Sequence, residues 1–294
     1  MKVITITPRG FCPGVVRAIK IVEDVLQDSS YPRPIQILGL IVHNRHVAAN
    51  LRENGAITVF DPTKTRKELL DDIFEGTVII TAHGADREVF RIAEEKGLKV
   101  VDATCKDVYH THDIIRERLN DGYQVIFVGK RLHPETEAIE SISPNITVVE
   151  TINDVASLRS SKAMAFATNQ TTFSFRDLDE IYRELKKKYP QIVIQEEICN
   201  STRIRQEAII AFNTSNKVDL CYIVGDPNSN NTKNLVKISE TVTNTKTILI
   251  QSLDEIDPAD LFGVKTISVS SGASTPTRIT NEVIAYLSSF DSVE

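Results

Sequence analysis

The chain has 294 residues, 41% of them hydrophobic and 25% charged, which is enough for one large domain or two to three small ones. Its net charge of −6 argues against a large nucleic-acid interface, because such an interface needs a basic face. No apolar run reaches the roughly 18 residues that a membrane span needs, and the polar N-terminal residues predict no signal peptide. We therefore expect a cytoplasmic protein with reduced thiols.

Segments typical of strands and of helices alternate along the chain. In chain order we expect a strand at 2–7, a helix at 14–27, a strand at 35–38, a helix at 43–54, a strand at 77–81, a helix at 85–96, a strand at 99–102, a helix at 107–120, strands at 124–129 and 163–167, helices at 175–188 and 202–216, strands at 219–225, 247–251 and 266–269, and a helix at about 276–289. Thr275-Pro276 predicts the start of the last helix, with threonine as its cap. This alternation indicates parallel sheets covered by helices.

Three cysteines recur at a nearly constant spacing. Cys12, Cys105 and Cys199 are 93 residues (12 to 105) and 94 residues (105 to 199) apart, and each stands just before a predicted helix. The repeat predicts three similar α/β units, at 1–104, 105–198 and 199–294, each near the lower end of usual domain size.

Each predicted unit also has two strands that end in polar residues. Ligands of open α/β sheets bind beyond the carboxyl ends of the strands. If the three units meet around a pseudo-threefold axis, three thiolates and six polar turns surround one cavity. The turns are centred on His43, His83, His133, Thr171, Ser229 and Ser274.

Widely spaced cysteines in a cytoplasmic chain are usually core thiols, and Cys221 fits that interpretation because its strand is apolar. The three repeated cysteines lie instead in turns at helix N-termini, where the helix stabilises a thiolate. Structural zinc usually takes four protein ligands, often as close cysteine pairs, which this chain lacks. Three thiolates on a four-iron cluster leave one iron open for a substrate, although three cysteines and a water could also hold zinc.

Nine short motifs in this order resemble one known family, the 4-hydroxy-3-methylbut-2-enyl diphosphate reductases, or LytB family. They span nearly the whole chain and are Pro8–Val15, Val42–Arg45, Ala82–Gly84, Asp102–Cys105, His133–Glu135, Asn169–Thr172, Ile198-Cys199 with Arg205–Ala208, Val224-Gly225 with Asn228–Asn231, and Ser271–Ser274. Asn230 stands where the family often has serine.

The resemblance implies three similar α/β units with mostly parallel sheets, in a pseudo-threefold trefoil around a central [4Fe–4S] cluster, one per chain, held by Cys12, Cys105 and Cys199. It implies reductive dehydroxylation of (E)-4-hydroxy-3-methylbut-2-enyl diphosphate to isopentenyl and dimethylallyl diphosphates, the last step of the methylerythritol phosphate route. Ferredoxin or flavodoxin is the implied electron donor.

We expect the diphosphate to be held by polar strand ends and Glu135 to deliver protons, with Thr171 orienting the hydroxyl or relaying a proton. The expected substrate-binding residues are His43, His83, His133, Ser229, Asn230, Asn231 and Ser274. A histidine beside a diphosphate should favour its protonated form. Three histidines match no motif and are expected to be surface or helix residues: His46, His110 and His112.

Other functions stay open. A quinolinate synthase-like [4Fe–4S] dehydratase would need no external reductant. A non-catalytic iron–sulfur sensor would need the thiolates but not the polar strand ends. A zinc-binding structural protein would be colourless, whereas an iron–sulfur protein absorbs near 400 nm.

Overall fold

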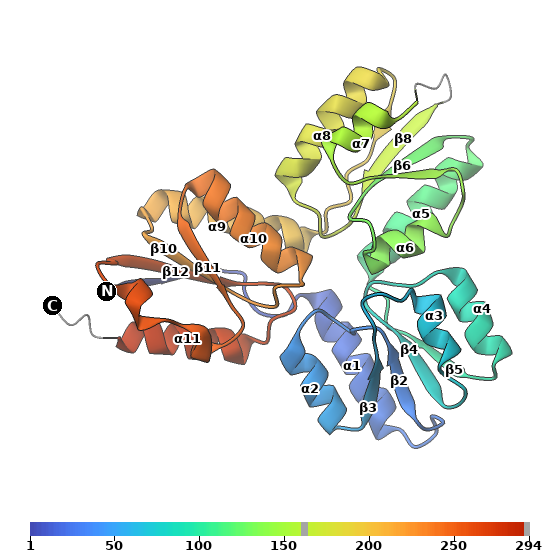
Figure 1. Ribbon diagram of the computed structural model, residues 1–294, viewed down its shortest axis with the longest axis horizontal. Coiled ribbons are helices and arrows are strands. Elements are labelled where there is room, and N and C mark those ends of the chain that lie inside the picture. Colours follow the sequence, from blue (N-terminus) through green and yellow to red (C-terminus); the bar gives the residue numbers. More distant parts are fainter. Residues whose placement is uncertain (160–163, 291–294) are drawn as a thin grey trace. The chain divides into compact units, whose positions relative to one another are not determined.

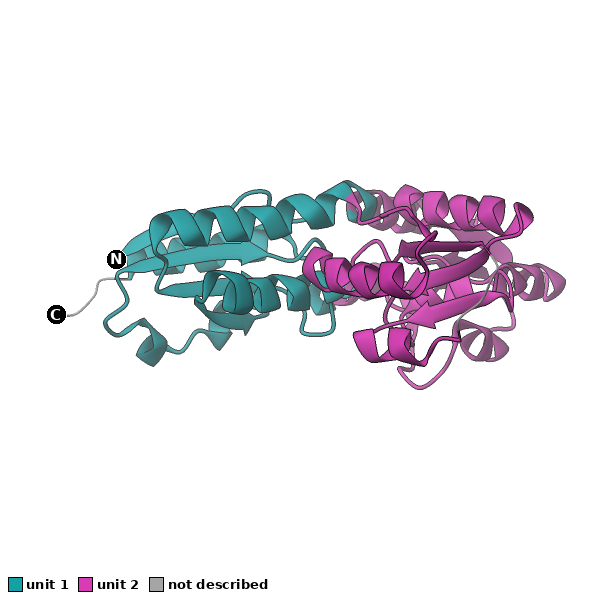
Figure 2. Ribbon diagram, turned by 90° about the horizontal axis from the view of Figure 1, so that it is seen from above, with its two compact units in different colours: residues 1–15, 43–47, 200–294 teal, residues 16–42, 48–199 magenta. Residues whose placement is uncertain are grey.

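The computed structural model describes residues 1–159 and 164–290, so Ala163, the first residue of the strand expected at 163–167, lies outside the described part. The chain divides into two compact units, shown in Figure 2. Unit 1 comprises Met1–Val15, His43–Val47 and Asn200–Glu294. Unit 2 comprises Val16–Val42 and Ala48–Cys199.

Unit 2 contains two four-stranded sheets in which all pairs are parallel (Figure 1). The first has the order β3-β2-β4-β5 and consists of β2 (Ile35–Leu38), β3 (Ala56–Val59), β4 (Thr77–Ile80) and β5 (Lys99–Asp102). The second has the order β7-β6-β8-β9 and consists of β6 (Gln124–Val128), β7 (Ile146–Val149), β8 (Ala165–Asn169) and β9 (Val193–Ile194).

Helices alternate with these strands. They are α3 (Arg66–Asp71), α4 (Arg87–Glu95), α5 (Lys106–Asn120), α6 (Pro134–Glu140), α7 (Ile152–Ser157) and α8 (Phe175–Lys188). Two further helices begin in unit 1 and continue in unit 2: α1 (Pro13–Gln27) and α2 (Arg45–Glu53).

Unit 1 contains the third parallel sheet, in the order β1-β12-β10-β11. Its strands are β1 (Lys2–Thr5), β10 (Leu220–Val224), β11 (Lys246–Ile250) and β12 (Thr266–Ser271). Its helices are α9 (Asn200–Asn216), α10 (Asn230–Thr243), α11 (Thr277–Ser289) and the short 3-10 helices η1 (Leu253–Glu255) and η2 (Pro258–Leu261).

The three sheets share one topology, so the predicted three α/β units with parallel sheets are confirmed. The two central strands are β2 and β4 in the first sheet, β6 and β8 in the second, and β10 and β12 in the third. The edge strand beside the second of these central strands is β5, β9 and β1, respectively, and is called the last edge strand. Strand β1 pairs with β12, Lys2 opposite Thr266, so the N-terminal strand completes the sheet of the C-terminal third. The bounds 1–104, 105–198 and 199–294 and the pseudo-threefold arrangement stay predictions.

The central strands are covered on both faces, and all but the serine-rich β12 are mainly apolar. Every residue of β2, β4, β6 after its first residue, β8 and β10 is buried, and such continuous runs are typical of parallel sheets between helices. The edge strands β1 and β5 are less covered: the first residue of each is exposed and the other three are half-buried. The strand ends are therefore positioned by rigid, fully packed backbone.

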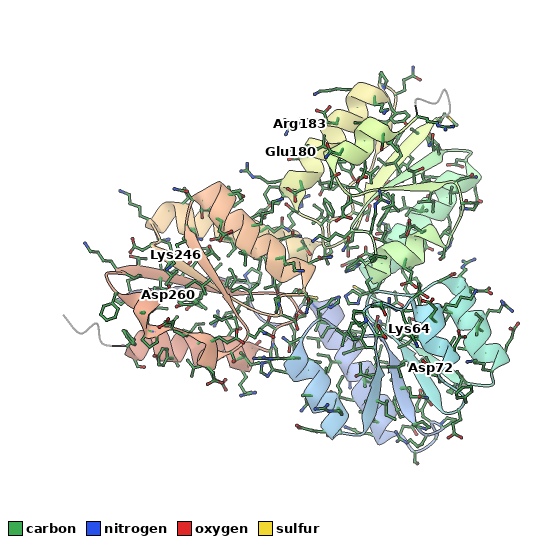
Figure 3. All side chains as sticks on the ribbon, viewed as in Figure 1. Lys64, Asp72, Glu180, Arg183, Lys246 and Asp260 are labelled. Atoms are coloured by element: carbon green, nitrogen blue, oxygen red, sulfur yellow. The ribbon has the colours of Figure 1, made fainter. Side chains whose placement is uncertain are left out.

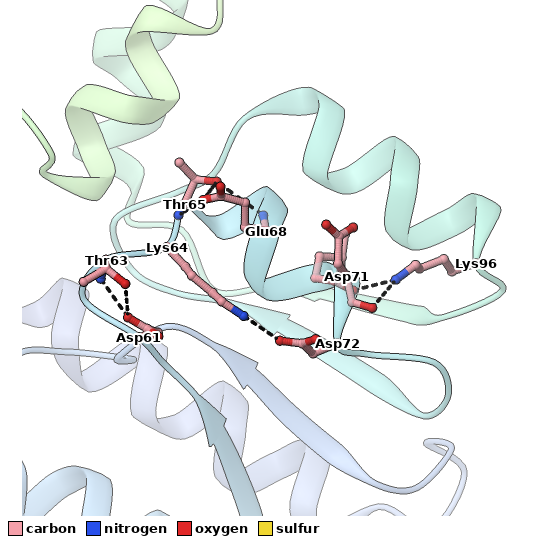
Figure 4. Close-up of polar contacts among 9 residues, drawn as sticks. Asp61, Thr63, Lys64, Thr65, Glu68, Asp71, Asp72 and Lys96 are labelled. Atoms are coloured by element: carbon pink, nitrogen blue, oxygen red, sulfur yellow. Dashed lines mark hydrogen bonds and ion pairs between the residues drawn. The ribbon is translucent and has the colours of Figure 1, made fainter.

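Several elements escaped the sequence patterns: the short β3, α3, α6, β7, α7 and β9, and the 14-residue helix α10. Helix α3 has only six residues, too few for a visible helical period, and it starts at a capping box. Thr65 N–H donates to the Glu68 carboxylate (2.7 Å) and Glu68 N–H donates to Thr65 Oγ1 (3.3 Å), as Figure 4 shows. A Lys64–Asp72 ion pair of 3.0 Å spans this helix.

Surface ion pairs of this kind recur in unit 1, where Lys246 at the start of β11 contacts Asp260 in η2 at 2.6 Å (Figure 3). Such exposed pairs contribute little to stability, typically about 0.2–1 kcal/mol. The fold is therefore stabilised chiefly by the buried sheets and helix faces.

One predicted helix start is wrong by one residue. The cap of α11 is Pro276, not Thr275, and the helix begins at Thr277. The Thr275 hydroxyl donates instead to the carbonyl of Val224 at the end of β10 (3.0 Å), so a tertiary contact takes the group that a local cap would have used.

Candidate active site

The three repeated cysteines occupy equivalent places in the fold. Each follows the last edge strand of a sheet and precedes a helix: Cys12 before α1, Cys105 before α5 and Cys199 before α9. Their backbone N–H groups donate to a carbonyl in the turn after the neighbouring central strand, and the acceptors are Ala273 for Cys12 (3.0 Å), Ala82 for Cys105 (2.9 Å) and Thr171 for Cys199 (3.0 Å). The sequence repeat therefore reflects a repeated backbone geometry.

The surroundings of these cysteines differ from those of Cys221. All four lie within the described residues, and none is in a disulfide. The three repeated cysteines are partly exposed, and Cys12 Sγ accepts a hydrogen bond from Val15 N–H (3.4 Å). Cys221 is fully buried in β10, and burial raises the pKa of its thiol, so it is unsuited to bind metal.

The turns that hold the cysteines form a second repeat. Three i to i+3 backbone hydrogen bonds of 3.1 Å close them, Gly84 to Thr81, Phe173 to Gln170 and Thr275 to Gly272. In this register Thr172, rather than Thr171, is the counterpart of His83 and Ser274. The sequence offsets alone had paired Thr171 with them, because insertions between strands shift the count.

A glycine at the end of one central strand marks the other set of polar turns. The N–H groups of Gly39, Gly129 and Gly225 donate to Val59 (2.8 Å), Val149 (3.0 Å) and Ile250 (2.8 Å) on the neighbouring strand. A Cβ at Gly129 or Gly225 would lie 2.8 or 2.6 Å from a threonine hydroxyl on the following helix, so larger residues do not fit. The predicted ligand-binding residues His43, His133 and Ser229 each lie four positions after this glycine.

Glu135 and Thr171 form a buried pair in unit 2. Glu135 is 1% exposed and Thr171 is 4% exposed. The Glu135 carboxyl accepts hydrogen bonds from Thr171 N–H (2.8 Å) and from the Thr171 hydroxyl (3.0 Å). Burial raises the pKa of Glu135 to about 7, although both bonds from Thr171 act to lower it. A carboxyl group with this pKa can hold and release a proton near neutral pH.

Two of the predicted histidines meet beside this pair. His133 caps α6, because its Nδ1 accepts a hydrogen bond from Glu135 N–H (3.2 Å). With Nδ1 engaged in the helix cap, Nε2 is the ring nitrogen that could contact a ligand. The rings of His83 and His133 touch edge to face, with centroids 5.4 Å apart.

Unit 1 contains the remaining predicted residues. Ser229 caps α10 through Thr232 N–H (3.4 Å), and the following Asn230 is only 8% exposed. The Asn231 side-chain carbonyl accepts from the Thr202 hydroxyl (2.9 Å). The Ser274 hydroxyl donates to the carbonyl of His43 (3.0 Å). Glu135 and Asn231 both lie six positions after the strand-end glycine of their sheet.

Sequence reasoning assigned no role to one buried cation in unit 1. Arg205 is 3% exposed and donates to the carbonyl of Gly10 (2.9 Å), two residues before Cys12. Gly10 has a φ of +77°, and a Cβ there would lie 2.2 Å from the Thr277 hydroxyl oxygen. A buried arginine next to a cysteine loop brings positive charge toward thiolates, and its place in a matched motif was the available signal.

Comparison with known proteins defines the class to which this fold and these residues belong. A curated reductase named 4-hydroxy-3-methylbut-2-enyl diphosphate reductase, from Bacillus licheniformis, is 47% identical over 99% of this chain and 92% of its own. The protein of the same name from Bacillus subtilis has the same identity and coverage. The solved structure of the E-1-hydroxy-2-methyl-but-2-enyl-4-diphosphate reductase from Plasmodium falciparum matches with a TM-score of 0.90 and 32% identity, covering 100% of this chain and 92% of that one.

The family model described as LytB protein matches residues 3–288. The chain belongs to the LytB family. Membership implies an iron–sulfur cofactor and a small diphosphate substrate. In residues 1–159 and 164–290, no helix is both long and apolar enough to cross a membrane.

Proposed function

We propose that this chain removes the hydroxyl group of (E)-4-hydroxy-3-methylbut-2-enyl diphosphate by reduction, in the last step of the methylerythritol phosphate route. Two electrons and two protons are consumed, the C–O bond breaks, and water leaves together with isopentenyl or dimethylallyl diphosphate. The observation that carries this proposal is the buried Glu135–Thr171 pair, because reductive loss of water needs a proton donor shielded from solvent.

The cofactor in this proposal is one [4Fe–4S] cluster per chain, with Cys12, Cys105 and Cys199 as its ligands. The donor set fits such a group: three thiols outside any disulfide, each before a helix, with the same backbone hydrogen bond fixing each one. When bound, the cluster supplies the electrons. The protein residues bind and orient the substrate and move protons.

Glu135 is the proposed proton donor. Thr171 holds the carboxyl group with two hydrogen bonds, and its own carbonyl accepts the N–H of Cys199, so it connects the acid to a proposed cluster ligand. Thr171 can also orient the substrate hydroxyl. Because the pKa of Glu135 is raised to about 7, a sizeable fraction of the acid is protonated at neutral pH.

The diphosphate is proposed to bind the polar strand ends. The group consists of His43, His83, His133, Ser229, Asn230, Asn231 and Ser274. His133 contributes its Nε2–H, because Nδ1 is occupied by the helix cap. Asn230 replaces the serine frequent in the family and offers two amide hydrogens, so it can still donate to a phosphate oxygen.

Ferredoxin or flavodoxin is the proposed electron donor, and the cytoplasm is the proposed location. The net charge of −6 means that any attraction between this chain and an acidic electron carrier must come from local basic groups.

The proposal is tested by purifying four single variants without oxygen: Cys12→Ser, Cys105→Ser, Cys199→Ser and the matched control Cys221→Ser. We expect each of the first three to lose iron, sulfide and absorbance near 400 nm, and the control to keep them. A Cys221→Ser protein without the cluster and a Cys105→Ser protein with it would overturn the ligand assignment.

The reaction is tested with the allylic diphosphate and reduced methyl viologen. Viologen oxidation with formation of both five-carbon diphosphates is the expected result. Turnover of the same enzyme on a dehydration substrate without reductant would instead favour the quinolinate synthase-like alternative. An intact cluster without either activity would favour a sensor.

A further inference from the structure

A cavity of about 540 Å³ lies within unit 2, between the start of α4 and the C-terminal parts of α5 and α6. Its volume falls in the range of about 300–1,000 Å³ typical of small-molecule sites. None of the cysteines, strand-end residues or carboxyl groups of the candidate active site lines it. It is therefore a separate feature of the molecule.

Two arginines line this cavity from different helices. Arg87 is the first residue of α4, and Arg116 lies in the second half of α5. Within the described part of the chain, the Arg87 side chain has no hydrogen-bond or ion-pair partner. Arg116 contacts Asp113 at 3.1 Å, but the Asp113 side chain is 73% exposed, so water screens the pair. Burial lowers the pKa of Arg116, and the nearby charge of Arg87 lowers it further.

The acidic residue of the cavity does not neutralise this charge. Asp86 lines the same space, but its carboxylate accepts the N–H of Glu88 (2.9 Å) as the cap of α4. The cavity lining therefore contains two guanidinium groups and one carboxylate, and that carboxylate is engaged in the helix cap. The balance favours an anion as occupant.

A buried histidine supplies a third group. His112 was expected to be a surface or helix residue; it lies in α5 and is 4% exposed, and it lines the cavity. Within residues 1–159 and 164–290, its Nε2 has no hydrogen-bond partner. Burial lowers the pKa of His112 to about 4, with Arg116 and Arg87 acting in the same direction, so the ring is neutral at pH 7. A buried polar atom of this kind is stabilised by a partner that enters with a ligand.

The rest of the wall combines apolar side chains with polar ones, among them Asn120, Ser141, Ser143 and Asn145. Leu119 of α5, Ala138 of α6 and Ile142 after α6 line the space. A phosphate alone would leave most of a cavity of this volume unfilled. A ligand with an anionic head and a short hydrophobic body uses both parts of the lining.

We propose that this cavity binds a small organic phosphate. Its phosphate oxygens accept hydrogen bonds from Arg87, Arg116 and His112, and its apolar body packs on Ala138 and Ile142. The His112 ring also packs behind the turn that carries His83, since a Cβ at Gly84 would lie 3.7 Å from His112 Cε1. The site thus adjoins the proposed substrate-binding turn without sharing residues with it.

The test is isothermal titration calorimetry of the anaerobically purified protein with three probes: phenyl phosphate, inorganic phosphate and phenol. Phenyl phosphate has the proposed head and body but is not an allylic diphosphate. We expect it to bind at one site, at least about tenfold more tightly than either fragment. Equal affinity for inorganic phosphate or for phenol would overturn the proposal, as would the absence of binding.

Variants locate the binding site. Arg87→Gln and the double variant Arg87→Gln/Arg116→Gln should weaken phenyl phosphate binding, the double variant by at least about tenfold. Arg87 is exposed, so the single variant is expected to fold. The matched control is Arg176→Gln, an exposed arginine in the first turn of α8, the helix that corresponds to α4. Unchanged binding by the double variant, or equal loss in the control, would place the ligand elsewhere.

Discussion

Replacing Glu135 by glutamine should change how the stability of the protein depends on pH. Burial raises the pKa of this carboxyl group from 4.5 to about 7. Between these values the folded chain holds a proton that the unfolded chain has lost, so the free energy of unfolding falls as pH rises. The stabilisation is full below about pH 4.5 and is lost as pH rises through 7. Glutamine cannot ionise and removes this dependence.

The magnitude follows from the size of the shift. One pKa unit corresponds to about 1.4 kcal/mol, so a shift from 4.5 to about 7 represents about 3 kcal/mol in total. Most of this difference develops between pH 5 and pH 8. The free energy of unfolding of Glu135→Gln minus that of the wild type should therefore be about 2–3 kcal/mol larger at pH 8 than at pH 5.

The assay is anaerobic urea unfolding followed by circular dichroism at pH 5, 6, 7 and 8. The matched control is Glu140→Gln, because Glu140 is the exposed last residue of the same helix and should show no such change. A difference between Glu135→Gln and wild type that stays constant from pH 5 to 8 would refute the reasoning. In the same preparations the variant should keep cluster and substrate binding but lose turnover, and normal steady-state rates would remove Glu135 from the mechanism.

Three further changes test particular contacts. Thr171→Val removes a hydroxyl that lowers the pKa of Glu135, so the acidic group in the pH–rate profile should titrate at higher pH. An unchanged profile would show that the Thr171 hydroxyl does not influence the acidic group that controls the rate. Leu132→Gly should raise the free energy of unfolding by about 1 kcal/mol, because Leu132 has a φ of +60° and is 98% exposed, and a lower urea midpoint would contradict this. Glu137→Ala should lower the free energy of unfolding by about 2 kcal/mol. The Glu137 carboxylate accepts the backbone N–H of Arg66 (3.1 Å) and lies 3.8 Å from the Arg66 guanidinium, and Arg66 is only 5% exposed. Glu140→Ala serves as control, and equal urea midpoints for the two variants would show that the Arg66–Glu137 pair is dispensable.

Local patterns determined the longer elements. The helical periods of α1, α5 and α8 and the apolar runs of β2, β6 and β10 are properties of neighbouring residues, so they are visible in the sequence. The spacing of the three cysteines likewise indicated a repeated unit before any contact was known. Short elements such as α3 and β9 have too few residues for a period, and a cap or a neighbouring strand fixes them.

Long-range pairing decided the rest. That β1 completes the sheet of the C-terminal third depends on hydrogen bonds to β12, and no local pattern encodes a partner 264 residues away (2 to 266). The counterpart of His83 in the second sheet is Thr172 because turn closure, not sequence offset, sets the register. The motif containing Glu135 was recognised from sequence, but the size of its pKa shift depends on burial and on Thr171, 36 residues away, which only the folded chain brings together.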